Sequence, residues 1–466
     1  MVFSSLVFIF VYLVAVLAIY YVTPLRLRNI FLLIINLIFY GWGEPIYVFL
    51  MLFSITVSYI FGLLVAKHRE NEKRARRLLA ASVVIHLSLL FFFKYFDFLI
   101  ANLALIPIFS GLEPIGLALP IGISFYTFQS MSYVIDVYRR DAEAQPNFAA
   151  FGTYVSLYPQ LIAGPIVRYK DVADQMVNRE HGVAKFSSGV QRFVIGLCKK
   201  VLLANSIGKL WDVYAAAGAG ELSVLGAWLG VIAFTFQIYF DFSGYSDMAI
   251  GLGRMLGFEF LENFNYPYIS RSITEFWRRW HISLGTWFRE YVYIPLGGNR
   301  CSKARNFFNI FVVWMLTGIW HGAAWNFLLW GVYYALLLML EKLVLLKLLK
   351  KAPAFLTHVY TMLLVLVGWA IFANEGLNQC GSYLATMFFC GSAPLFLPTD
   401  AYYLVNYAAV LIICAVASVP AAANMMRKLP NSLRTVAVPV LIAIGLLLCT
   451  AYLVDATYNP FLYFRF

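Results

Sequence analysis

The chain has 466 residues, of which 62% are hydrophobic and only 12% are charged. A soluble protein of this length carries about twice that charged fraction, so the composition excludes an ordinary soluble enzyme and indicates a polytopic helical membrane protein. The net charge is +12, but the basic residues cluster in short loops between apolar segments, which favours positive-inside topology over nucleic-acid binding.

Apolar blocks long enough to span a bilayer recur along the whole chain. We predict an all-α fold of eleven or twelve transmembrane helices in one integral-membrane domain, residues 1–466. The basic loops all face the cytoplasm if the N-terminus lies outside. The expected spans are residues 3–22, 29–42, 46–66, 79–103, 118–138, 187–208, 223–240, 304–321, 323–346, 355–373, 402–424 and 435–453.

Residues 241–303 do not fit a simple span, because charged residues alternate there with many aromatic ones. Polar backbone survives at membrane depth only where protein buries it or where it lines a cavity. We therefore predict a cap of short amphipathic helices on the cytoplasmic side, dipping into the membrane.

Asp241, Ser243 and Asp247 lie where the span at residues 223–240 is expected to end. Six residues separate the two aspartates, so on one helix they face different directions and are not expected to form a carboxylate dyad. Orienting a histidine or an arginine is the functional interpretation. The alternative is a helix cap with solvated carboxylates.

His281 follows Trp277, Arg278, Arg279 and Trp280. Paired arginines bind phosphates, and tryptophans stack on nucleotides or pack at the membrane interface, so this segment is a candidate site for an anionic donor. A surface histidine in a basic amphipathic helix is the alternative interpretation.

His321 lies between Trp320 and Gly322, with Gly318 one turn earlier. An ionisable side chain at membrane depth is costly unless it lines a polar cavity, so His321 is a candidate functional residue. A neutral imidazole facing an acceptor hydroxyl is a general base for acyl transfer. The alternative is a core histidine that is hydrogen-bonded to a neighbouring helix.

Other chemistries lack their sequence patterns. The six cysteines show no metal-ligand spacing, and no phosphate loop, zinc motif or Gly-x-Ser-x-Gly elbow stands near the candidate residues. We expect neither a metal nor a bound cofactor.

Taken together, these segments resemble the membrane-bound O-acyltransferase family and, within it, the branch that acetylates alginate. The resemblance covers about residues 1–345 and the ending at 461–466. Its most specific parts are Tyr239–Met248, Phe276–Leu284, Tyr293–Arg300 and Trp320–Gly322.

The resemblance implies a ring of tilted helices around a tunnel, in which a cytoplasmic acyl donor meets an outer acceptor. His321 matches the principal catalytic histidine of the family and His281 the second. Acetyl-CoA is the implied donor, an extracytoplasmic polysaccharide the acceptor, a separate outer-face acyltransferase the partner and the bacterial inner membrane the location.

Three alternatives remain open from the sequence. D-Alanyl transfer to teichoic acid belongs to a sibling branch with a similar Trp-x-Arg-Trp-His stretch. A transporter or flippase without group-transfer chemistry commonly shows internal repeats and intramembrane carboxylates, and we find no repeat here. The third is a scaffold subunit with vestigial histidines.

Overall fold

The computed structural model describes residues 2–162, 164–218, 221–390, 392–455 and Leu462. These residues form helices, turns and bends and contain no β-strand, which confirms the predicted all-α class. The chain divides into two compact units, residues 1–193 with 245–261 and residues 194–244 with 262–466. The boundary falls inside two helices, α10 (Val183–Cys198) and α12 (Val224–Met255).

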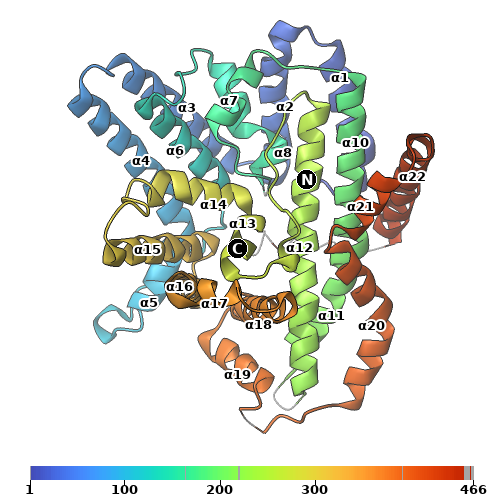
Figure 1. Cartoon of the computed structure of the whole chain (residues 1–466). Coiled ribbons are helices and arrows are strands. Elements are labelled where there is room, and N and C mark those ends of the chain that lie inside the picture. Colours follow the sequence, from blue (N-terminus) through green and yellow to red (C-terminus); the bar gives the residue numbers. More distant parts are fainter. Residues whose placement is uncertain (1, 163, 219–220, 391, 456–461, 463–466) are drawn as a thin grey trace. The chain divides into compact units, whose positions relative to one another are not determined.

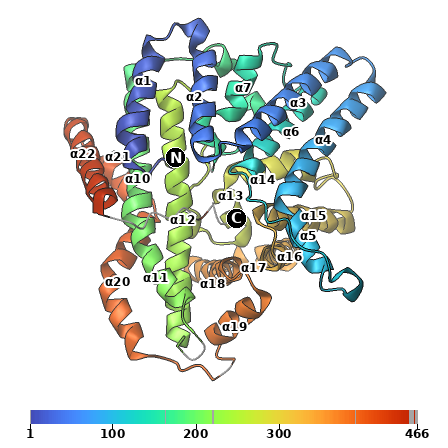
Figure 2. The ribbon, with the colours of Figure 1, turned by 180° about the vertical axis from the view of Figure 1, so that it is seen from behind.

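The first unit consists mostly of helices from the N-terminal third of the chain. Helices α3, α4 and α6 lie side by side in both views (Figures 1 and 2). Besides its parts of α10 and α12, the unit contains η1 Val7–Tyr12, α1 Leu13–Val22, η2 Leu25–Leu27, α2 Arg28–Gly43, α3 Tyr47–Lys67, α4 Glu72–Lys94, α5 Phe96–Leu103, η3 Pro107–Phe109, α6 Ile123–Arg139, α7 Phe148–Ser156, α8 Tyr158–Leu161, α9 Tyr169–Val172 and η4 Asp174–Met176.

The second unit holds the rest of α10 and α12 and contains both candidate histidines. Its other elements are η5 Lys199–Ala204, α11 Asn205–Ala215, η6 Pro267–Ile269, α13 Ile273–Arg279, α14 Ile282–Phe288, η7 Arg289–Tyr293, α15 Lys303–His321, α16 Trp325–Leu340, η8 Glu341–Leu345, α17 Leu346–Leu349, α18 Ala354–Ala373, α19 Leu377–Met387, α20 Pro398–Ala417, α21 Ala421–Lys428 and α22 Asn431–Asp455.

Seven helices among the described residues are long and apolar enough to cross a membrane, and Val7–Val22 is a shorter apolar helix. The expected spans at 304–321 and 323–346 correspond to α15 and α16, which do not meet the same length and hydropathy criteria. Several expected spans are divided into shorter pieces, because π-helical segments such as η5 and η8 interrupt the α-helical hydrogen bonding. The chain is a multi-pass membrane protein, and the number of crossings stays a prediction.

The predicted end of the span at residue 240 is wrong, because α12 continues without a break to Met255. The physical reason is that both aspartates are neutralised inside their own units. Asp241 pairs with Lys200 at 2.5 Å, and Asp247 pairs with Arg192 at 2.7 Å. A helix with paired charges needs no solvent at these positions, so the cap of short helices starts after Met255.

Close packing of α15 against α16 fixes the helix that ends at His321 (Figure 1). A β-carbon at Gly318 would overlap the backbone carbonyl of Phe327, and one at Gly331 would overlap that of Trp314. Glycine at both positions therefore lets the two backbones approach at a distance that no larger residue permits.

Candidate functional site

His321 is the last residue of α15, and the chain leaves the helix at Gly322 before α16 begins at Trp325. The side chain is buried, with 8% of its surface exposed. Its ring centroid lies 5.1–5.2 Å from those of three aromatic residues, Trp320, Trp330 and Phe372. The helix end therefore presents the imidazole inside an aromatic enclosure.

His281 connects α13 to α14 in a left-handed backbone conformation, with φ 45° and ψ 54°. A non-glycine residue rarely adopts this conformation, which costs on the order of 1–3 kcal/mol and occurs most often at functional sites. The sequence did not reveal this strain. It turns the chain so that the buried imidazole lies against Trp320, at 5.9 Å between ring centroids.

The hydrogen bonds of His281 assign its tautomer. Oδ1 of Asn263 accepts the backbone N–H of Ser283 at 3.1 Å, so the atom facing His281 is an oxygen. Nδ1 of His281 lies 3.2 Å from that oxygen and must therefore donate its proton. Nε2 is left as the unprotonated nitrogen, and among the described residues this buried atom has no hydrogen-bond partner.

Burial, together with nearby His321, holds the pKa of His281 well below its ordinary value. The imidazole is therefore neutral near pH 7, with a lone pair on Nε2 that is available to accept a proton. Asn263, which the sequence analysis missed, orients this ring and lies 18 residues upstream in an irregular segment.

The two histidines, 40 residues apart in the sequence, line one cavity of about 510 Å³. Trp280 also lines it, as do Trp277 and Trp314. The volume matches a small-molecule binding site, in which aromatic walls and a few polar groups converge. The structure thus brings together two residues that the sequence analysis selected independently.

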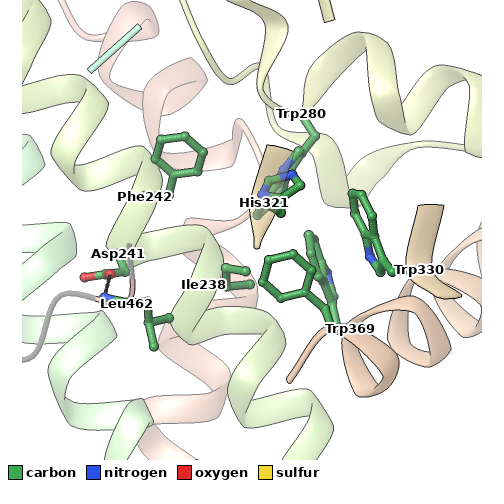
Figure 3. Close-up of a pocket in the computed structure, with 9 residues that line it drawn as sticks. Ile238, Asp241, Phe242, Trp280, His321, Trp330, Trp369 and Leu462 are labelled. Atoms are coloured by element: carbon green, nitrogen blue, oxygen red, sulfur yellow. Dashed lines mark hydrogen bonds between the residues drawn. The ribbon is translucent and has the colours of Figure 1, made fainter. Parts of the chain in front are cut away.

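A second cavity borders His321 and Trp280 and has a volume of about 10 Å³, which is room for roughly one water-sized group. Figure 3 shows its walls, which are mostly aromatic and include Trp330, Trp369 and Phe242. Among the described residues, His321 and Trp280 are the two that line both cavities.

Asp241 also lines the small cavity and makes two buried contacts. One carboxylate oxygen pairs with Lys200, whose side chain is 3% exposed. The other accepts the backbone N–H of Leu462 at 3.0 Å, so that residue lies at the cavity (Figure 3). Lys200 was missed at the sequence level, although a lysine inside the apolar stretch 187–208 signals that an intramembrane partner exists.

The three basic residues of this region differ in their surroundings. Arg278 and Arg289 are exposed and line the large cavity, and neither guanidinium has a hydrogen bond or ion pair within the described part of the chain. Arg279 does not line the cavity and instead pairs with Glu275 at 2.9 Å and donates to Asn265 O at 3.1 Å. A donor role for Arg279 stays a prediction, and its guanidinium is already engaged.

The remaining predicted residues have separate places. Ser243 is buried in the second unit but lines neither cavity, and Asp247 belongs to the first unit, where Arg192 neutralises it. Trp320 contacts both histidine rings. Gly322 is required by packing, because a β-carbon there would overlap the ring of Phe327.

The sequence is similar to a family of acyltransferases and to proteins named as O-acetylases. A match to MBOAT, the membrane-bound O-acyltransferase family, covers residues 137–378. The probable alginate O-acetylase AlgI of Azotobacter vinelandii is 45% identical over 394 residues, which are 84% of this chain and 79% of that protein. The AlgI protein of Pseudomonas aeruginosa (strain PAO1) is 46% identical over 84% of this chain and 76% of its own length.

More distant relatives have other acceptors in their names. The peptidoglycan O-acetyltransferase of Helicobacter pylori is 34% identical over 73% of this chain and 70% of its own length. The teichoic acid D-alanyltransferase of Bacillus subtilis is 29% identical over 47% of this chain and 58% of its own length. From the family match and these identities, the chain belongs to the membrane-bound O-acyltransferase family.

Proposed function

We propose that this membrane O-acetyltransferase moves an acetyl group from a cytoplasmic thioester donor toward an extracytoplasmic polysaccharide, with His321 as the reacting base. The observation that carries the proposal is the position of His321, whose ring borders both the large and the small cavity. A group in that position reaches a donor in the large cavity and an acceptor hydroxyl that approaches from the other side.

The large cavity suits a donor with an anionic part. Arg278 and Arg289 line it, and arginine binds phosphate through two parallel hydrogen bonds. Trp277 and Trp314 add flat apolar walls. Coenzyme A combines phosphates with a planar base and a thioester, so we propose acetyl-CoA as the donor and Arg278 with Arg289 as its phosphate contacts.

In the proposed step, the imidazole of His321 takes the proton from the acceptor hydroxyl while the hydroxyl oxygen attacks the thioester carbonyl carbon. The carbon–sulfur bond breaks, and the sulfur leaves as the thiol after it receives the proton from the imidazolium. Positioned proton transfer of this kind contributes about 10²–10⁴ in rate. His281, neutral and adjacent, keeps a second imidazole beside the same cavity.

The acceptor is proposed from the relatives. Their names specify alginate and peptidoglycan, so a bacterial envelope polysaccharide is the proposed final acceptor, reached directly or through a partner acyltransferase on the outer face. The identity to alginate O-acetylases over 84% of the chain favours acetyl over D-alanyl transfer, for which the similarity covers 47%. We further propose the bacterial inner membrane as the location.

The test compares two buried histidines. His321→Gln removes the base, and His86→Gln is the matched control, because His86 is 1% exposed, bonded to Ser58 at 2.9 Å and outside both cavity linings. Ester-linked acetate on the extracellular polysaccharide is measured per amount of folded protein. We expect acetate to be lost with His321→Gln and kept with His86→Gln. Wild-type acetate with His321→Gln contradicts the proposal.

A further inference from the structure

Glu341 is a fully buried carboxylate outside both cavity linings, with 0% of its surface exposed. It is the first residue of the π-helical segment η8, directly after α16. A π-helical turn inserted in an α-helix often marks a functional position. A buried carboxylate is costly unless hydrogen bonds satisfy its oxygens, so its partners indicate why it is there.

The partners of Glu341 lie mostly at the start of α13. Oε1 accepts the backbone N–H of Ile273 at 2.7 Å and the hydroxyl of Tyr360 at 3.3 Å. Oε2 accepts the backbone N–H of Thr274 at 2.8 Å and its hydroxyl at 2.6 Å. Three of the four hydrogen bonds therefore hold the first turn of α13, beside the cap that Ser272 provides.

Helix α13 depends on such contacts because it has only seven residues, Ile273–Arg279. Isolated helices shorter than about 12–15 residues are marginal in water, so tertiary contacts fix the direction of this one. Arg278, in its last turn, lines the large cavity, and the two residues that follow the helix are Trp280 and His281. A tilt at the start of α13 displaces the groups at its end.

Helix α16, which continues directly into η8 at Glu341, also contacts the helix that ends at His321. Helix α16 packs on α15 through Gly331 and Gly318, and α15 ends at His321. The continuous segment α16–η8 thus touches two parts of the site. It holds the start of α13, which leads to His281, through Glu341, and it packs on the helix that ends at His321 through the glycine contact.

We propose that Glu341 is a positioning residue that sets the place of His281 and Arg278 relative to His321. This inference rests on the proposed function, since it assigns a role in the reaction of those residues. The carboxylate touches neither substrate nor reacting atoms. It acts by holding the first turn of α13 on the scaffold that also carries His321.

A purely structural role is the competing explanation, and Asp400 provides the matched control. Asp400 is also a buried carboxylate of the second unit, 1% exposed, and accepts hydrogen bonds from the hydroxyls of Ser223 and Tyr214 and from the backbone N–H of Leu397. It holds no segment that bears a candidate histidine. Glu341→Gln and Asp400→Asn each replace one acceptor oxygen by a donor in such a network.

The experiment uses the full-length protein in nanodiscs, with acetyl-CoA as the donor and thiol release as the readout, normalised to folded protein. We expect Glu341→Gln to lower kcat by about 10–100-fold, since displacement of a reacting group by about 1 Å costs on the order of 10² in rate. Asp400→Asn should keep kcat within a few-fold. Wild-type kcat in Glu341→Gln, or an equal loss in Asp400→Asn, overturns the positioning role.

A second pair of variants tests the contact itself and is available if Glu341→Gln does not fold. Thr274→Val removes the hydroxyl that donates to Glu341, whereas Thr274→Ser keeps it. Because Thr274 also lines the large cavity, kcat is measured at saturating acetyl-CoA. We expect a loss of kcat in Thr274→Val and recovery in Thr274→Ser. Equal kcat in both contradicts the inference.

A His321→Gln variant measured in the same assay separates the two proposals. If His321→Gln keeps full turnover, the proposed function fails, whereas full turnover in Glu341→Gln alone refutes only the positioning role.

Discussion

The buried ion pair between Lys200 and Asp241 allows a prediction with a defined magnitude. The two side chains are 3% and 2% exposed, and 2.5 Å separates Nζ from Oδ1. Asp241→Asn leaves the ammonium of Lys200 buried without its counter-charge. Breaking such a pair from one side costs about 3–5 kcal/mol, which corresponds to a factor of roughly 10²–10⁴ between folded and unfolded protein.

The assay is the fraction of detergent-solubilised protein that remains monodisperse after heating over a series of temperatures. We expect Asp241→Asn and Lys200→Met each to lower strongly the temperature at which half of the protein remains monodisperse. The double variant should be more stable than the sum of the two losses predicts, because it buries no unpaired charge. Glu143→Gln is the control, since Glu143 is 83% exposed and its pair with Arg69 at 3.0 Å contributes about 0–1 kcal/mol.

Two results would refute this reasoning. The first is wild-type thermal stability in both single variants. The second is additive losses in the double variant, which would mean that Lys200 and Asp241 contribute independently of each other.

The cavity, the helix packing and the histidine environment give three further predictions. Arg278→Ala should raise the acetyl-CoA concentration at half-saturation about 10–100-fold, which corresponds to the loss of a charged hydrogen bond of about 1.5–3 kcal/mol. Arg279→Ala should change this concentration little. Equal effects of the two variants contradict the assignment of Arg278 to the donor. Gly318→Ala should sharply reduce the yield of folded protein in membranes, while Gly41→Ala, where a β-carbon meets open space, should not. The folded-state pKa of His281 is depressed, so its ring stays neutral as the pH falls past about 6.5, while the same ring in the unfolded chain takes up a proton. The thermal stability of the wild type should therefore fall more steeply than that of His281→Gln as the pH is lowered below about 6.5, and an equal fall in both argues against this shift.

Much of the fold is predictable from the sequence, because apolar runs in a membrane protein have few structural solutions. The all-α class and most helix positions follow from these runs. The end of α12 did not, since Asp241 and Asp247 look like the polar end of a span until Lys200 and Arg192 are known to neutralise them. Such pairing joins residues about 40–55 positions apart and leaves no local signal.

The candidate site was predictable only in part, because some of its residues stand out in the sequence and others are defined by tertiary contacts. His281 and His321 are recognisable because a histidine among glycines and tryptophans in an apolar chain is unusual. The difference between Arg278 and Arg279 was not, because it depends on the direction in which a seven-residue helix presents each side chain. The donor-side position of Arg289 and the ring partner Asn263 depend on tertiary contacts alone.

We propose that His321 performs the transfer at the border of the two cavities. Its most direct test is thiol release from acetyl-CoA by purified protein with an acceptor present, for the wild type and for His321→Gln. We expect kcat to fall by a factor of about 10²–10⁴, with the acetyl-CoA concentration at half-saturation within a few-fold of the wild type. A kcat within a few-fold of the wild type in folded His321→Gln protein would contradict it.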